Sequence, residues 1–161
     1  MSKVAIVMGS AKDQPRMKAA GEILARFGVE YDEQVLSAHK TPDAAFEFAA
    51  NAADQGYAVI IAGAGKAAHL AGVMAAKSLL PVIGVPLSAS LQGLDALLAT
   101  VQMPTGVPVA TVAIDGSANA ALLAIAILAL QDQALAEQLA EYRRELAEQN
   151  PDDFPLEGGS T

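Results

Sequence analysis

The chain has 161 residues, of which 53% are hydrophobic and only 17% charged, and it carries a net charge of −8. Its acidity, without a basic stripe, excludes nucleic acid as an expected partner, and the absence of cysteine excludes disulfides and thiolate metal sites. Because the chain has only two histidines, we expect no metal site. Its apolar runs are too short for a signal peptide or a membrane span, so we expect a cytoplasmic protein that contacts no membrane.

Short β-branched runs alternate with segments of helical periodicity from the first residues onward. We expect strands at residues 3–9, 31–38, 57–64, 81–87 and 107–114. We expect helices at residues 14–28, 41–56, 66–79, 91–102, 118–130 and 133–149. Five strands separated by helices predict a parallel sheet covered on both faces. The sequence thus predicts an α/β fold, a three-layer doubly wound sheet of the flavodoxin-like order 2-1-3-4-5 with C-terminal helices.

The expected single domain covers residues 1–155, and the tail LEGGST at 156–161 reads like a linker or a cloning scar. The segment 118–130 is apolar on every side, which does not suit a helix with one face in water. The low content of charged residues also favours surface hidden by association. We therefore expect an oligomer in which the helix at 118–130 packs between subunits.

Polar and glycine-rich segments follow the first three strands of the predicted sheet. Their candidate site residues are Ser10, Asp13, Ser37, His39, Lys40, Gly65, Lys66 and His69. In the order 2-1-3 these strands are neighbours, so their carboxyl ends meet at one edge of the sheet, where such folds bind ligands. Histidines, an acid, hydroxyls and lysines beside a glycine-rich helix start suit a small phosphorylated substrate and proton transfer.

Several of these residues also have structural interpretations, which the sequence alone leaves open. Ser10 and Asp13 could cap the first helix. Thr41, followed by proline and aspartate, is typical of a helix N-cap. His69 is expected inside a helix, where it could be a partly buried structural residue.

The segment GAGKAA at 63–68 matches a dinucleotide-binding pattern, because it follows a strand and opens a predicted helix. That pattern requires an acid at the end of the next strand, where this sequence has PVIGVPLSAS. A phosphate-binding P-loop fails as well, since Ala67 follows Lys66 where serine or threonine is required. We therefore exclude a nicotinamide or flavin dinucleotide site.

Several segments taken together resemble the N5-carboxyaminoimidazole ribonucleotide mutase family of purine biosynthesis, the PurE type. These segments are VAIVMGS, SAHKTPD, VIIAGAG with AAHL, and GLDALLATVQMPTGVPVATVAI. The resemblance extends from about residue 3 to 130. It implies a flavodoxin-like homo-octamer that needs no metal or organic cofactor. It also implies an isomerase that moves a carboxyl group from N5 to C4 of a phosphoribosyl aminoimidazole, through release and recapture of carbon dioxide.

The same resemblance implies a role for each candidate residue. His39 matches the catalytic histidine, which transfers protons to and from the substrate. The other matches are phosphate and ribose contacts at Ser10 and Asp13, further phosphate contacts at Ser37 and Lys40, and a loop around the carboxyl group containing Gly65, Lys66 and His69.

Four residues depart from the family pattern. Lys12 stands where the first loop of the family has a second serine. Lys40 stands where the family has arginine, Lys66 replaces a glycine and Ala71 replaces a proline. Lys40 is reminiscent of a related branch, the direct aminoimidazole ribonucleotide carboxylases that use carbon dioxide. Lys66 and Ala71 motivate another alternative, an engineered or weakly active oligomeric scaffold of the same fold. A flavin-binding electron carrier is a distant alternative, because few aromatic residues are available to stack on a flavin.

Overall fold

The computed structural model describes residues 2–149, and the predicted linker at 156–161 lies outside this range. Five strands form one parallel sheet in the order β2-β1-β3-β4-β5. The strands are β1 (Lys3–Met8), β2 (Tyr31–Val35), β3 (Tyr57–Gly65), β4 (Val82–Leu87) and β5 (Ala110–Thr111). The α-helices of the described range are α1 (Gln14–Arg26), α2 (Pro42–Asn51), α3 (Leu70–Lys77), α4 (Leu94–Val101), α5 (Ser117–Ala129) and α6 (Gln133–Gln149).

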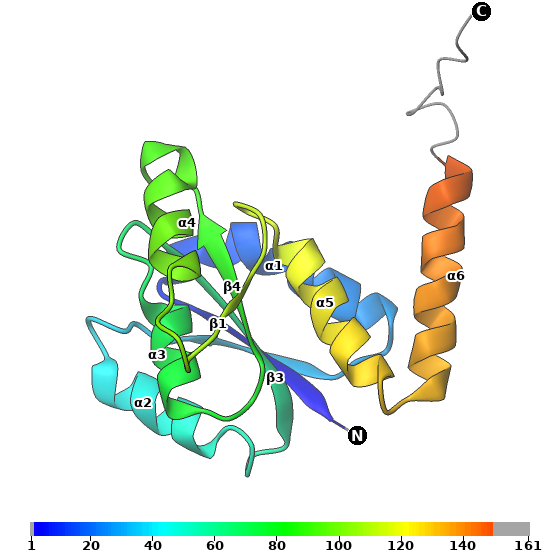
Figure 1. The fold of residues 1–161 in the computed structure, drawn as a ribbon, viewed down its shortest axis with the longest axis horizontal. Helices are drawn as coiled ribbons and strands as arrows, with labels where there is room; N and C mark the ends of the chain where they lie inside the picture. Colours follow the sequence, from blue (N-terminus) through cyan, green and yellow to red (C-terminus); the bar gives the residue numbers. More distant parts are fainter. Residues whose placement is uncertain (1, 150–161) are drawn as a thin grey trace, which may run out of the picture.

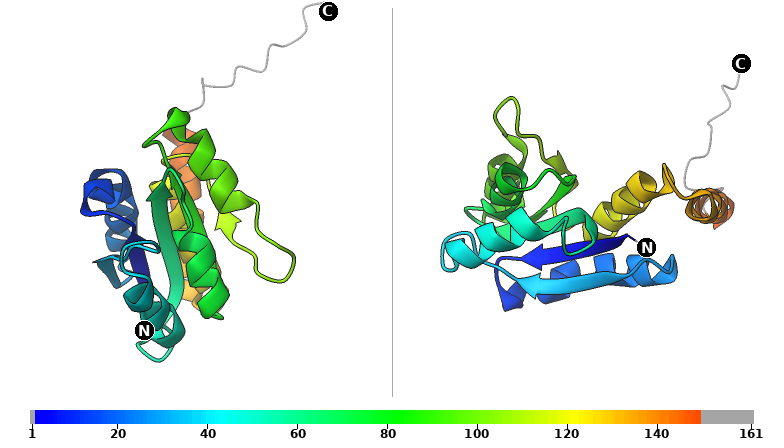
Figure 2. Two further views of the ribbon diagram at one scale, coloured as in Figure 1. Left: turned by 90° about the vertical axis from the view of Figure 1, so that its left-hand side faces the viewer. Right: turned by 90° about the horizontal axis from the view of Figure 1, so that it is seen from below.

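Helices cover both faces of the sheet, as Figures 1 and 2 show, and the predicted doubly wound fold and strand order are confirmed. Val4 and Ile6 of β1 pack with Leu24 of α1 and with α5 on one face. Val7 of β1 packs with Phe48 of α2 and with α3 on the other face. The near-continuous apolar runs of the central strands follow from this arrangement, since alternate side chains enter two different cores.

Three of the predicted elements are shortened most in the structure. The helix predicted from residue 66 begins only at Leu70, because Lys66 has a left-handed backbone with φ of 54°. The strand predicted at 107–114 is reduced to Ala110–Thr111 at the sheet edge, where Pro108 has no N–H to donate to a ladder. The helix predicted to 56 ends at Asn51, before a turn that closes on Gly56 with φ of 86°.

The helix α5 buries only one side of its apolar surface within the chain. Ala121 and Ile125 are fully buried against the core, whereas Leu123 is 37% exposed and Leu130, at its C-cap, is 79% exposed. The apolar residues on the outside of α4 and the turn before it are exposed too: Leu91, Leu94, Leu98 and Val101. The packing of the 118–130 helix between subunits remains a prediction.

The C-terminal helix α6 contacts the rest of the fold near the end of α1. Tyr142 packs edge-on against Phe27, with ring centroids 5.6 Å apart, and Arg26 donates to Glu145 at 2.6 Å. The helix α6 lies at one side of the fold, apart from the sheet (Figure 1). No helix within residues 2–149 is both long and apolar enough to cross a membrane.

Candidate active site

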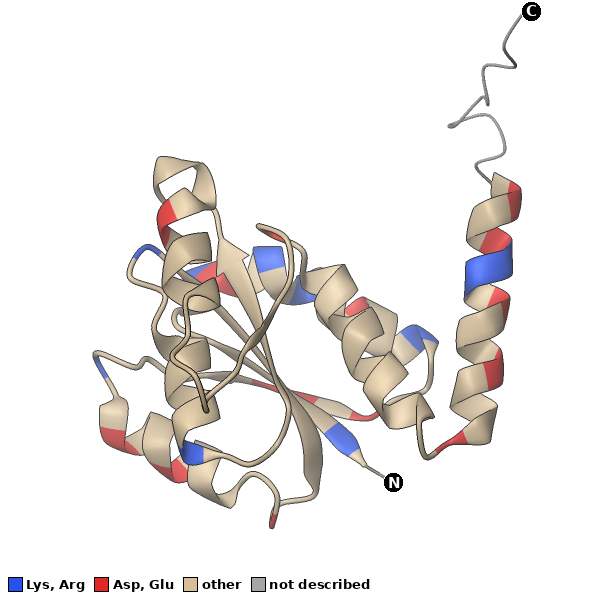
Figure 3. Ribbon diagram, in the orientation of Figure 1, with Lys and Arg blue, Asp and Glu red and all other residues tan. Residues whose placement is uncertain are grey.

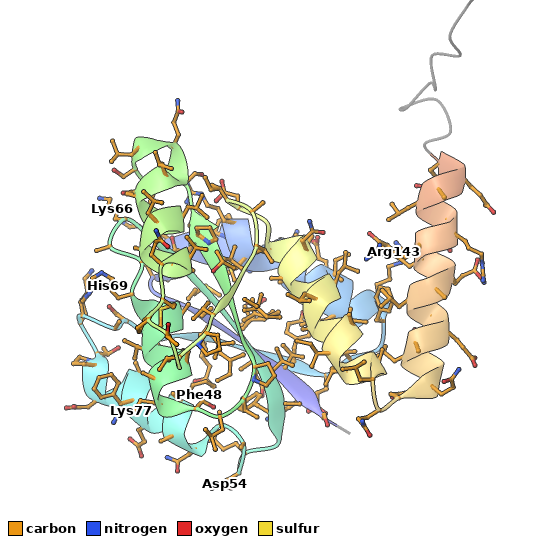
Figure 4. All side chains as sticks on the ribbon, viewed as in Figure 1. Phe48, Asp54, Lys66, His69, Lys77 and Arg143 are labelled. Carbon is orange, nitrogen blue, oxygen red and sulfur yellow. The ribbon has the colours of Figure 1, made fainter. Side chains whose placement is uncertain are left out.

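A cavity of about 650 Å³ lies at the carboxyl edge of the sheet, where β1, β2 and β3 end. All eight candidate residues from the sequence line it: Ser10, Asp13, Ser37, His39, Lys40, Gly65, Lys66 and His69. Figure 4 shows Lys66 and His69 on the loop that joins β3 to α3. The convergence expected from the strand order is therefore present in the structure.

The loop after β1 places one hydroxyl and one carboxyl group at the cavity. The hydroxyl of Ser10 accepts a hydrogen bond from the Lys12 N–H at 3.3 Å, which caps a short 3-10 turn at Ala11–Asp13 and not the first helix α1. Asp13 occupies the N-cap position of α1, but its carboxylate makes no capping hydrogen bond. Burial raises the pKa of Asp13 above its usual value, although the charge of Arg16 and a backbone hydrogen bond from Ser10 oppose the shift.

The loop after β2 is closed by hydroxyl groups on either side of His39. Ser37 accepts a hydrogen bond from the Lys40 N–H at 3.0 Å. Thr41 accepts from the Ser37 N–H at 3.0 Å and donates to the Ser37 carbonyl at 3.2 Å. Thr41 is the N-cap residue of α2, as predicted, yet its side chain makes no capping hydrogen bond. Its hydroxyl instead stabilises the turn that carries His39.

The two histidines of the chain meet across the cavity. Nε2 of His39 lies 2.7 Å from Nδ1 of His69, and the rings are nearly perpendicular at 78° with centroids 4.8 Å apart. At this distance one nitrogen donates and the other accepts, so the pair shares one proton along the contact. His69 lies immediately before α3, at its N-cap position, so the expectation of a histidine inside the helix is wrong.

Gly65 and Lys66 shape the wall of the cavity beside this histidine pair. A Cβ at Gly65 would lie 2.7 Å from the Cβ of Ala89, so the loop after β4 approaches too closely for a side chain. Lys66 follows with φ of 54°, a conformation that costs a non-glycine residue about 1–2 kcal/mol. Such strain is concentrated at functional sites, which favours a functional role for the turn.

The cavity is cationic although the chain is acidic. Lys12, Arg16, Lys40 and Lys66 line it, against the single acid Asp13. Aspartate and glutamate residues occur instead along α2 and α6, as Figure 3 shows. Local cationic character of this kind attracts an anionic ligand, which the net charge of −8 would otherwise repel.

The sequence singled out Lys12 only as a departure from the family pattern in the first loop, and it did not single out Arg16. Arg16 lies three residues after Asp13 in the first turn of α1, so both can reach the same edge. That spacing was the one signal in the sequence that could have identified it.

Fold and cavity together define a doubly wound α/β protein that holds a ligand across the ends of three neighbouring strands. The chain belongs to the AIR carboxylase family, whose sequence model matches residues 3–149. This is the family that the sequence motifs resemble.

Curated relatives and a solved structure agree with this assignment. The chain is 54% identical over 147 residues to an N5-carboxyaminoimidazole ribonucleotide mutase of Pyrococcus abyssi, covering 91% of this chain and 84% of that protein. It is 52% identical over 157 residues to the mutase of Escherichia coli K12, covering 94% and 93%. The crystal structure of Treponema denticola PurE superposes with a TM-score of 0.85 at 30% identity, covering 98% of this chain and 100% of that one.

Proposed function

We propose that this protein is an N5-carboxyaminoimidazole ribonucleotide mutase, an isomerase of purine biosynthesis that needs no cofactor. The observation that carries the proposal is the cationic cavity in which His39 contacts His69 at 2.7 Å. The names of relatives at 52–54% identity supply the substrate and the reaction. The direct carboxylase alternative is not favoured, because Lys40 is its only support within the chain.

The proposed reaction needs one proton to change place. The bond between N5 and the carboxyl carbon breaks and releases carbon dioxide, and N5 gains a proton. C4 then attacks the carbon dioxide through its ring electrons, and the proton on C4 leaves. The net change is therefore a carboxyl group moved from N5 to C4 and one proton moved from C4 to N5.

His39 is suited to carry that proton. An imidazole accepts and donates protons near neutral pH, so one residue can serve both N5 and C4. His69 holds one nitrogen of the His39 ring in a defined hydrogen bond, which orients the ring and selects its tautomer. We assign His39 as the acid and base, and His69 as the residue that positions it.

The remaining candidates bind the substrate in this proposal. Lys40 and the hydroxyl of Ser37 bind the phosphate, while Ser10 and Asp13 contact the phosphate and the ribose. The turn at Gly65 and Lys66, which packs closely against Ala89, surrounds the carboxyl group in this proposal. The cationic lining matches a substrate that bears both a phosphate and a carboxylate.

A homo-octamer in the cytoplasm completes the proposal. The association of subunits is supported by the apolar surface on α4 and α5 that the single chain leaves exposed, including Leu94 at 54% and Leu98 at 51%. Light scattering of the purified protein should give about eight times the mass of one chain, and a monomer would contradict the interpretation of these surfaces.

Replacement of the proton carrier tests the mechanism. His39→Asn should lower kcat by about 100-fold to 10,000-fold, the usual contribution of a positioned acid or base. Lys77→Gln, on α3 and outside the cavity lining, is the matched surface control and should keep the parent rate. Activity of His39→Asn equal to that of the control would remove His39 from the reaction.

A further inference from the structure

Arg16 is a cationic residue of the cavity to which the strand-end pattern gave no role. It lies in the first turn of α1, and it lines the same cavity as His39. The helix dipole disfavours a cation at this end of a helix. Helix stability therefore does not explain an arginine at this position, whereas a bound anion would benefit from both the dipole and the guanidinium.

The backbone at Arg16 is fixed from a distant part of the chain. The hydroxyl of Ser117, in the first turn of α5, donates a hydrogen bond to the Arg16 carbonyl at 2.8 Å. Ser117 is only 1% exposed, so the donating side chain is buried. It anchors the start of α1 against α5, next to the loop that follows β5.

That loop places the carboxylate of Asp115 near the guanidinium of Arg16 without a hydrogen bond between them. Nε of Arg16 lies 3.9 Å from Oδ1 of Asp115, which is an ion pair but longer than a hydrogen bond. Asp115 already accepts hydrogen bonds from the backbone N–H of Ser88 at 3.0 Å and from the Ser88 hydroxyl. Within residues 2–149, Asp115 is the only acid within ion-pair distance of Arg16.

We propose that Arg16 binds an anionic group of the substrate, and that Asp115 is a positioning residue that holds the guanidinium at the cavity. A guanidinium presents paired N–H donors that match either a phosphate or a carboxylate, and here these donors are left for a ligand. The identity of the substrate rests on the proposed function. The anion-binding role rests on the geometry alone.

Calorimetric titration tests this role without any need for turnover. Three probes separate the two anionic groups: the C4-carboxylated ribonucleotide, the same compound without its phosphate, and the ribonucleotide without its carboxylate. Arg16→Gln should weaken binding of the first probe by about tenfold to a hundredfold, the range for a hydrogen bond to a charged group. Lys18→Gln removes the same charge two residues further along α1, outside the cavity lining, and should bind like the parent.

The weakening should disappear for the probe that lacks the group bound by Arg16, which identifies that group as phosphate or carboxylate. Unchanged affinity of Arg16→Gln, or equal weakening for all three probes, overturns the proposal. If the parent binds none of the three, the proposed function fails, and titration with inorganic phosphate then tests Arg16 separately. Weaker phosphate binding by Arg16→Gln than by the parent supports the role, whereas equal binding, or none by the parent, overturns it.

Asp115→Asn tests the positioning role. Asp115 has φ of 58°, which asparagine tolerates, and the amide can still pair with Ser88, so the loop should keep its shape. In the parent background, Asp115→Asn should weaken binding of the C4-carboxylated ribonucleotide. In the Arg16→Gln background, the same change should cause no further loss of affinity. Additive losses in the double variant would show that Asp115 acts independently of Arg16.

Discussion

Removal of the His69 imidazole should slow the reaction by a factor set by one hydrogen bond. In the structure Nδ1 of His69 lies 2.7 Å from Nε2 of His39, and both rings line the cavity. When His39 holds the transferred proton it is charged, and a hydrogen bond to a charged group contributes about 1.5–3 kcal/mol. His69→Phe keeps an aromatic ring but has no acceptor, so kcat should fall by about tenfold to a hundredfold.

The position of the contacting atom supplies a matched control. The side-chain amide of asparagine ends near the position of histidine Nδ1, so His69→Asn retains a hydrogen-bonding group opposite His39. His69→Asn should therefore keep most of the parent rate, with thermal unfolding used to check that both variants are folded. The assay follows formation of the C4-carboxylated ribonucleotide from the N5-carboxylated substrate. A His69→Phe variant as active as the parent, or a His69→Asn variant as slow as His69→Phe, would refute the positioning role.

Three further predictions concern stability. Gly65→Ala places a Cβ 2.7 Å from that of Ala89, so the free energy of unfolding should fall by about 1–3 kcal/mol in denaturant titrations. Adding Ala89→Gly should restore part of it, and no recovery would contradict the clash. Lys66→Gly removes the strain of a side chain at a left-handed backbone position, so it should raise the free energy of unfolding by up to about 1 kcal/mol. A loss of stability in this variant would argue against strain. A hydrogen bond from Lys3, the largest cause, lowers the pKa of Asp32. The Asp32 carboxylate therefore stabilises the fold at pH values above its unfolded pKa of about 3.9, and this advantage is lost as the pH falls through the lower folded pKa. In thermal unfolding, the melting temperature of the parent should exceed that of Asp32→Asn at neutral pH, and this gap should close in acid. A gap that is constant with pH would rule out the ion pair as its source.

The strand order and the position of the cavity could be predicted because they depend on local patterns. Runs such as the one containing Val4, Ile6 and Val7 are apolar on both faces, which only a sheet covered on both sides accommodates. The carboxyl ends of neighbouring parallel strands meet at one edge, so residues that follow β1, β2 and β3 were brought together whatever the details of their loops.

The parts that could not be predicted depend on contacts between distant segments or on a single backbone angle. Lys66 and the alanines after it have good helix propensity, so periodicity did not predict the left-handed turn before His69. The one signal for it was that Lys66 stands where the family pattern has a glycine, the residue that adopts a positive φ most readily. The hydrogen bond between His39 and His69 joins residues 30 apart. The pairing of Arg16 with the loop after β5 depends on how α1 and α5 pack, which no periodicity encodes.

Product formation from two alternative substrates tests the central claim most directly. The purified protein is supplied either with the N5-carboxylated ribonucleotide or with the uncarboxylated ribonucleotide and bicarbonate, and the C4-carboxylated product is measured. The proposed mutase predicts rapid formation of the product from the N5-carboxylated substrate, lost in His39→Asn, and much slower formation from the second mixture. Faster formation from bicarbonate and the uncarboxylated ribonucleotide, or no product from either, would contradict the proposal.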